Sequence, residues 1–173
     1  MQKSYLFLQG PHGPFFKELG GRLRDSGARV LRVNFNGGDW IDWNSADAIS
    51  YTGSQYDWPA YVSDLLQRHR ITDLVVFGDC RSLHSIAIEQ SRAFGIKVYA
   101  FEEGYIRPDW ITLEEGGVNG YSRFCSDPDL CLTPPDETVE VPSRKVGPSM
   151  RWILFYCIRY YLAKSFWSYR FRH

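Results

Sequence analysis

The segment that most constrains the fold is residues 72–77, a run of apolar and β-branched side chains with a single aspartate near its start. Such a run predicts a strand buried on both faces, as in a parallel sheet covered by helices. A helix pattern follows over residues 83–94, with Ser82 as its predicted N-cap and Gly95 as its end. Residues 96–100 form the next apolar run. This part of the chain therefore predicts a strand–helix–strand unit.

The same alternation precedes this unit. Residues 5–8 and 29–33 have strand patterns, and residues 15–26 between them repeat apolar side chains at helical spacing. Another helix pattern covers residues 58–69, whereas residues 40–55 have no clear period and are predicted as a loop. This regular alternation predicts an α/β fold with an open, parallel, Rossmann-like sheet and right-handed crossovers.

The last third of the chain has a different character. Residues 125–149 are rich in proline and predict an extended linker. Residues 150–171 predict a helix that is apolar nearly all round, which must be buried against something. We therefore expect three parts: a Rossmann-like domain over 1–124, the linker, and an apolar, basic and aromatic helix within 150–173.

Charge is unevenly distributed along a chain whose formal net charge is zero. From Arg144 onward there are seven basic residues and no acid, so the part before it carries a net charge of −7. The four cysteines form no CxxC pair and no metal-ligand spacing, which predicts reduced thiols and no metal site. No signal peptide and no apolar run approaching ~20 residues is evident, so we expect a cytoplasmic location.

Four predicted loops carry most of the polar and glycine residues: 10–14, 34–40, 78–81 and 101–119. All four follow predicted strands, and in open α/β sheets ligands bind beyond the carboxyl ends of the strands. We therefore expect the loops to share one cleft. The chain has neither a G-x-G-x-x-G nor a Walker motif, so it lacks a nucleotide fingerprint.

Each of the first three loops offers a candidate site residue with a structural alternative. His12 can act as a general base or bind a sugar hydroxyl, but it also lies in a glycine- and proline-rich segment typical of a tight turn. Asp39 either contributes a carboxylate to the site or bonds the neighbouring backbone in a turn. Asp79 and Arg81, with His84 one turn into the next helix, are either site residues or structural partners.

The fourth loop contains the strongest local evidence for a functional site. Adjacent side chains of extended backbone point in opposite directions, so only one of Glu102 and Glu103 can face the cleft. Gly104 lets the chain turn directly after Glu103, which favours that residue. Arg107 can bind a carboxylate or phosphate with two parallel hydrogen bonds. A glycosyl-transfer site needs such a carboxylate and such a cation, although a charged surface loop would have the same composition.

These segments also resemble a known family. The motifs are FLQGPHGPFF at 7–16, NFNGGD at 34–39, FGDCR at 77–81 followed by His84, and EEGYIRPDWITLEEGGVNG at 102–120. In this order they resemble the capsule polysaccharide synthesis and export family, which includes the KpsS- and KpsC-like bacterial proteins. The resemblance covers roughly residues 5–122.

The resemblance implies a retaining β-Kdo glycosyltransferase that transfers the acidic sugar Kdo from CMP-Kdo to a phospholipid or Kdo-lipid acceptor. It implies a GT-B-type enzyme of two Rossmann-like domains, without cofactor or metal. The expected partners are CMP-Kdo, a lipid acceptor at the inner membrane surface and capsule export or assembly proteins, but no nucleic acid. The expected location is cytoplasmic, with a peripheral position at the inner membrane.

By the same resemblance, Glu103 is the catalytic carboxylate. The substrate-binding residues would be His12, Asp39, Asp79, Arg81, His84, Arg107, Thr112, Glu114 and Asn119.

The chain departs from the family at one point. The family's cytosine-nucleotide site is marked by a His-Pro motif in the second domain, and this chain has no His-Pro dipeptide. We therefore expect the chain to correspond to the N-terminal, acceptor-side half, with its last helix leading toward a missing second domain or resting on anionic lipid. Two alternatives remain: a truncated, non-catalytic or partner-binding protein of the same machinery, and an unrelated flavodoxin-like binding module.

Overall fold

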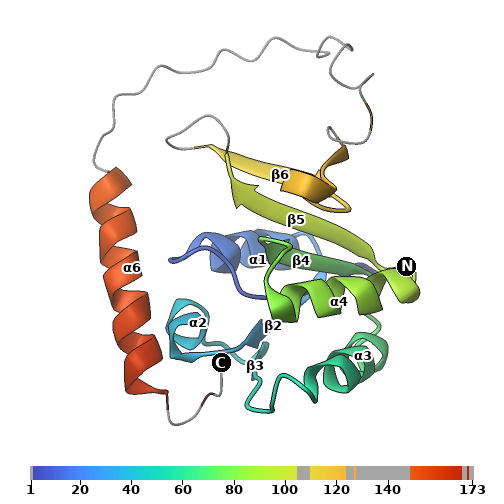
Figure 1. The fold of residues 1–173 in the computed structure, drawn as a ribbon, viewed down its shortest axis with the longest axis horizontal. Helices are drawn as coiled ribbons and strands as arrows, with labels where there is room; N and C mark the ends of the chain where they lie inside the picture. The colour runs from blue at the N-terminus through green and yellow to red at the C-terminus, as the bar shows by residue number, and fades with distance from the viewer. Residues whose placement is uncertain (1, 105–109, 124–126, 128–148, 169–170, 172–173) are drawn as a thin grey trace.

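The computed structural model describes residues 2–104, 110–123, 127, 149–168 and 171 (Figure 1). One six-stranded sheet has the order β3-β2-β1-β4-β5-β6. The strands are β1 Ser4–Phe7, β2 Arg29–Asn34, β3 Ala48–Ser50, β4 Asp73–Phe77, β5 Lys97–Glu103 and β6 Ile111–Glu115. The helices are α1 Phe15–Asp25, α2 Gly37–Asp42, α3 Trp58–Arg68, α4 Ser82–Ala93, the 3-10 turn η1 Asn119–Tyr121 and α6 Ser149–Phe166.

The predicted α/β fold with a Rossmann-like sheet is confirmed, with one difference at the edge. Strands β1 to β5 are parallel, but β6 pairs with β5 in the antiparallel direction. The segment predicted as a loop from residue 101 to 119 is thus largely a hairpin, and β5 continues to Glu103 instead of ending at Ala100. The amide of Gly104 donates to the carbonyl of Trp110 (2.8 Å), which closes the hairpin beyond the paired strands.

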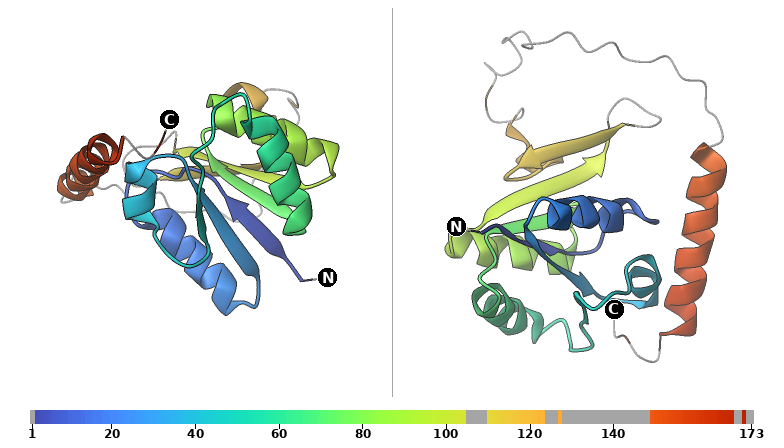
Figure 2. Two further views of the ribbon diagram at one scale, coloured as in Figure 1. Left: turned by 90° about the horizontal axis from the view of Figure 1, so that it is seen from below. Right: turned by 180° about the vertical axis from the view of Figure 1, so that it is seen from behind.

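Alternate residues of the central strands enter two separate cores. Leu6, Leu74 and Val98 belong to the cluster under α3 and α4, while their neighbours Phe7 and Val75 belong to the cluster under α1. Figure 2 shows the sheet as the middle layer between these helices. Both faces are therefore covered, as the apolar run of β4 predicts.

Two local predictions were wrong. The part predicted as loop between β2 and α3 contains the short helix α2 and strand β3. The Asn36 side chain accepts a hydrogen bond from the amide of Asp39 (3.0 Å), and this N-cap starts α2 in a sequence with two glycines. Ser82 is the first residue of α4 rather than its cap; Arg81 stands at the cap position and makes no side-chain capping bond.

Helix α6 runs along the edge of the sheet at which the parallel strands end, beside α2 (Figures 1 and 2). It ends at Phe166, earlier than the predicted residue 171. Within this chain α6 is buried on one side: among its side chains that the structure describes, Tyr160 and Ala163 are buried, whereas Trp152, Leu162 and Phe166 are more than half exposed. The predicted linker lies almost entirely outside the described residues.

Candidate functional site

Two cavities at the carboxyl-end edge of the sheet border β5, one on each side of the strand. Glu103 borders a cavity of about 300 Å³ with His12 and Arg81. Glu102 borders another of about 280 Å³ with Asp79, Arg81 and Asn119. The strand pleat accounts for this separation, because consecutive side chains leave opposite faces of a strand. Each of the two glutamates therefore has its own cavity, and Arg81 reaches both.

Helix α6 forms one wall of the Glu103 cavity. Ile153 and Cys157 line it, while Trp110 and Ile111 close the side of the hairpin. The cavity thus combines a carboxylate, an imidazole and a guanidinium with apolar side chains. This mixture suits a polar ligand that also has C–H surfaces, as a sugar does.

His12 is held as a neutral group in this cavity. Its ring packs on Tyr160 with 4.2 Å between centroids, and its Nδ1 is buried without a hydrogen-bond partner in the described part of the chain. Burial lowers the pKa of His12, and the nearby Arg81 lowers it further, against the opposing charges of Asp42 and Asp39. A neutral imidazole can accept a proton at pH 7.

Arg81 is oriented by Gln9, which sequence analysis did not single out. The Arg81 guanidinium donates to Gln9 Oε1, and Gln9 Nε2 donates to Asp39 Oδ1 (3.0 Å) and to the Tyr160 hydroxyl. The Gln9 side chain therefore links Arg81, which lines the cavity, to the buried Asp39 and Tyr160. Gln9 directly follows the first strand in the predicted cleft, and that position was the signal that could have found it.

Asp39 binds a side chain of α6 and lines neither the Glu103 nor the Glu102 cavity. Its carboxylate is 1% exposed, accepts from the amide of Phe35 (2.9 Å) and the hydroxyl of Tyr160 (3.0 Å), and lies 3.8 Å from the Arg32 guanidinium. The Phe35 contact is the bond to neighbouring backbone that the sequence left open as the alternative to a site role for Asp39. Its second role, as an anchor for α6, had no signal in the sequence because Tyr160 lies 121 residues away.

The glycines before Asp39 make the close approach of α6 possible. A Cβ at Gly37 would lie 2.4 Å from the carbonyl oxygen of Ala163, and a Cβ at Gly38 would lie 2.5 Å from the Tyr160 ring. Real Cβ atoms do not approach other atoms so closely, so any side chain here would displace the helix. The NGGD motif is therefore part of the docking surface for α6.

Asp42 and Arg159 add an ion pair to this docking surface. Arg159 donates to the Asp42 carboxylate, which also accepts from the amide of Gly13 (3.0 Å). Burial raises the pKa of the Asp42 carboxyl, although both of these contacts oppose the rise.

Two predicted substrate-binding carboxylates are engaged in the fold. Asp79 accepts from the amide of Val118 (2.8 Å) and from the Cys80 thiol (3.2 Å), and this bond raises the pKa of the thiol. Glu114 accepts from the Ser122 hydroxyl (2.7 Å) and the amide of Arg123 (3.2 Å). Both carboxylates hold the segment that follows β6.

The other predicted residues are spread around the hairpin and α4. Asn119 donates to Glu102 Oε2 (3.4 Å), and Thr112 pairs with Glu102 across the hairpin. The buried His84 donates from Nδ1 to the carbonyl of Gly78 (2.7 Å), and burial lowers its pKa to about 3. The predicted role of Arg107 lies outside the described residues.

Within the described ranges, no group of three or more His, Cys, Asp or Glu side chains is arranged to hold a metal ion. The same part of the chain contains no helix that is both long and apolar enough to span a bilayer.

Comparison with known proteins decides the family. A family model described as capsule polysaccharide biosynthesis protein matches residues 72–173, more than half of the chain. The chain belongs to the capsule polysaccharide biosynthesis family. The predicted resemblance is thereby confirmed.

Curated members of the capsule polysaccharide biosynthesis family match most of the chain. The capsule polysaccharide export protein KpsS of Escherichia coli is 40% identical over 97% of this chain and 42% of its own length. The capsule polysaccharide modification protein LipB of Neisseria meningitidis serogroup A is 37% identical over 75% of this chain and 32% of its own length. The chain thus spans less than half the length of the curated relatives it matches.

A solved structure illustrates the partial similarity of this fold to known enzymes. WbmH, an enzyme of Bordetella bronchiseptica in complex with NAD+, has a TM-score of 0.40 and 13% identity, over 55% of this chain and 37% of that chain. A similarity of this size supports no argument about the site.

Proposed function

We propose that this chain forms the acceptor-side wall of a retaining β-Kdo glycosyltransferase in capsule polysaccharide biosynthesis. The substrates would be CMP-Kdo and a phospholipid or Kdo-lipid acceptor. The observation that carries the proposal is the cavity at the carboxyl-end edge of the sheet, where Glu103, His12 and Arg81 meet. Family membership supports the capsule pathway, and the chemistry of the cavity supports a sugar substrate.

The three residues match the needs of the proposed reaction. In a first displacement, the Glu103 carboxylate attacks the anomeric carbon, the bond to the CMP phosphate breaks, and CMP leaves with the electron pair. In a second, the acceptor hydroxyl oxygen bonds to the same carbon, the bond to Glu103 breaks, and the hydroxyl proton passes to neutral His12. Two displacements retain the anomeric configuration. Arg81 would bind the carboxylate of the acidic sugar.

The proposal assigns separate tasks to separate parts of the family architecture. Residues 1–124 would form the acceptor-side domain, residues 125–149 the linker, and residues 150–173 the helix leading toward a second domain that binds the nucleotide. The contacts of α6 with the cavity and with α2 support a helix that joins the two walls of one cleft.

Glu103→Gln tests the proposal, with Glu102→Gln as the matched control. Glu102 is the neighbouring glutamate on the opposite side of β5, so its substitution changes charge equally without touching the Glu103 cavity. Transfer of Kdo from CMP-Kdo to a Kdo-lipid acceptor is measured for the chain itself and for a fusion in which it replaces the matching part of E. coli KpsS. We expect Glu103→Gln to abolish transfer and Glu102→Gln to keep kcat near the wild-type value, with any loss confined to the KM for the acceptor. Transfer near the wild-type rate in Glu103→Gln would show that the catalytic assignment is wrong.

The proposed acceptor also implies a peripheral position at the cytoplasmic surface of the inner membrane. Arg151 and Lys164 flank the exposed apolar side chains of α6, and basic and aromatic residues together favour anionic lipid surfaces. Flotation with phosphatidylglycerol vesicles should recover the chain, and Trp152→Ser with Leu162→Ser should reduce recovery. Equal flotation of both forms would contradict lipid binding through α6.

A second candidate function is a non-catalytic, partner-binding protein of the same capsule machinery. The exposed apolar face of α6 favours it, since such a face normally contacts another protein or a membrane. Absence of transfer in both the chain and the fusion would favour this candidate over the enzyme.

A further inference from the structure

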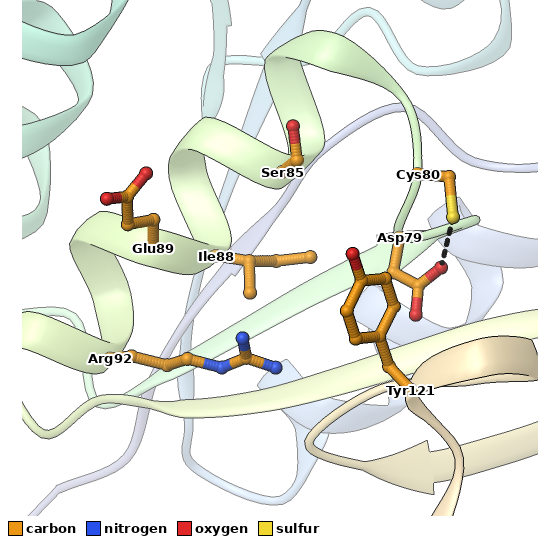
Figure 3. A pocket seen from close by; sticks show the side chains of 7 residues that line it. All are labelled: Asp79, Cys80, Ser85, Ile88, Glu89, Arg92 and Tyr121. Atoms are coloured by element: carbon orange, nitrogen blue, oxygen red, sulfur yellow. Dashed lines mark hydrogen bonds between the residues drawn. The ribbon is translucent and has the colours of Figure 1, made fainter. Parts of the chain in front are cut away.

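A third cavity lies on the far side of Asp79 from the carboxyl-end edge, between α4 and η1. Its volume is about 480 Å³, within the range of small-molecule sites. Figure 3 shows the lining side chains, which come from the end of β4, from α4 and from η1: Asp79, Cys80, Ser85, Ile88, Glu89, Arg92 and Tyr121. Asp79 and Cys80 also line the Glu102 cavity, so the two cavities adjoin.

The walls of this cavity are fixed by contacts with the turn after β6. Arg92 donates to the carbonyl of Gly116 (2.6 Å), and Asp79 accepts from the amide of Val118 (2.8 Å). The Tyr121 amide donates to the carbonyl of Val118 (3.0 Å), which holds the tyrosine on the same turn. A Cβ at Gly117 would lie 2.6 Å from the Tyr121 Cβ, so glycine is required for this arrangement. The cavity is therefore formed before any ligand arrives.

The chemistry of the lining favours a sugar. Tyr121 is 64% exposed and presents an aromatic ring, while the buried Ile88 gives an apolar floor. Such surfaces pack against the C–H faces of a pyranose, as aromatic side chains commonly do. Ser85 donates its hydroxyl to the carbonyl of Ser82 (3.0 Å), so its oxygen can still accept from a sugar hydroxyl.

Arg92 is the side chain of the lining that can bind an acidic sugar, because the other two charged side chains there, Asp79 and Glu89, are carboxylates. In Figure 3 the Arg92 side chain extends along the cavity toward Tyr121, whereas the Glu89 carboxylate points away. The bond to Gly116 uses one of the five N–H donors of the Arg92 guanidinium, which leaves donors for a planar carboxylate. Both Asp79 oxygens already accept hydrogen bonds, so their charge is partly compensated.

We propose that this cavity is a subsite for an acidic sugar residue of the acceptor, with Tyr121 against the ring and Arg92 on the carboxylate. The choice of an acceptor sugar rests on the proposed function. Arg81 borders both the Glu103 and the Glu102 cavities, and the latter joins this one at Asp79. An acceptor of more than one residue would extend from the reacting carbon along this connected surface.

The test uses the whole chain and NMR amide shifts, which report where a ligand binds. The probes are the methyl β-glycoside of Kdo and its methyl ester, which lacks the negative charge. We expect shift changes within residues 85–92 and 117–121, and about tenfold tighter binding of the acid than of the ester. Tyr121→Ala should weaken binding of the acid about tenfold. Tyr56→Ala is the control, because Tyr56 is 95% exposed and borders none of the cavities described above.

Arg92→Met separates charge from packing, since methionine keeps an apolar stem of similar length. This variant should bind acid and ester equally. Equal binding of both probes by the wild type, or unchanged binding in Tyr121→Ala, would overturn the proposal. Binding of CMP at these amides without binding of the glycoside would make the cavity a nucleotide pocket and would also overturn it.

Glu103→Gln distinguishes failure of the subsite from failure of the proposed reaction. Glu103 lines a different cavity, so this variant should retain the shift changes at Tyr121 while losing Kdo transfer. Glycoside binding that depends on Tyr121 and Arg92 in a protein without transfer activity would support the subsite and refute the reaction. Transfer that depends on Glu103, without binding of the glycoside at Tyr121, would support the reaction and refute the subsite.

Discussion

The buried His84 makes the stability of this fold dependent on pH in a window that can be calculated. Burial lowers its folded-state pKa to about 3, whereas an unfolded histidine titrates near 6.5. Below pH 6.5 the unfolded chain therefore binds a proton at His84, whereas the folded chain binds it only near pH 3. The free energy of unfolding consequently decreases as the pH falls through this window. Between pH 7 and pH 5, a shift of this size reduces the free energy of unfolding by about 2 kcal/mol.

The assay is urea denaturation at pH 7 and pH 5, comparing the wild type with His84→Asn. The asparagine amide can still donate to the Gly78 carbonyl but does not titrate, so the pH-dependent loss should shrink by about 2 kcal/mol. His69→Asn is the control, because His69 is only partly buried and should leave most of the loss unchanged. An equal pH-dependent loss in wild type and His84→Asn would refute the argument that His84 is buried as a neutral group.

Two substitutions test the contacts that hold α6 against the edge of the sheet. Gly38→Ala places a methyl group against the Tyr160 ring and should lower the free energy of unfolding by about 1–3 kcal/mol in urea denaturation, whereas Gly21→Ala, with nothing within 4 Å, should be neutral or stabilising. Tyr160→Phe removes a donor to the buried Asp39 carboxylate and should cost about 1–3 kcal/mol by the same measurement. Tyr161→Phe, on the exposed side of α6, should change the free energy of unfolding by less than about 0.5 kcal/mol. Equal effects at the two tyrosines would show that the Tyr160–Asp39 contact does not stabilise the packing of α6.

The parts of the fold that sequence predicted are those set by local pattern. The run over residues 72–77 is buried on both faces, and Gly27 and Gly95 follow helices with positive φ, where glycine is favoured. The antiparallel β6 was missed because its apolar residues, Ile111 and Leu113, are exposed at the edge of the sheet. An edge strand of this kind lacks the buried pattern on which strand prediction depends.

The candidate site was predicted less completely, because its residues are joined by contacts distant in sequence. Position at the ends of strands correctly brought His12, Arg81 and Glu103 to one cavity. Position alone could not show that Asp79 and Glu114 are engaged by backbone amides, since those bonds depend on how the hairpin returns to α4. The local signal for a carboxylate near a cleft is the same for a ligand-binding group and for a structural one.

The contacts of α6 explain why several polar motifs occur at this edge. Gly13 approaches the Tyr156 ring, Gly38 approaches Tyr160, and Asp39 accepts from Tyr160, so two of the motifs shared with the capsule family contact this helix. Gln9 then connects Tyr160 to Arg81, which borders the Glu103 cavity. A displacement of α6 would therefore alter both the wall of that cavity and the orientation of its cation. Helix α6 is therefore a structural component of the candidate site. The motifs around it fix its position and also contribute residues that line the Glu103 cavity.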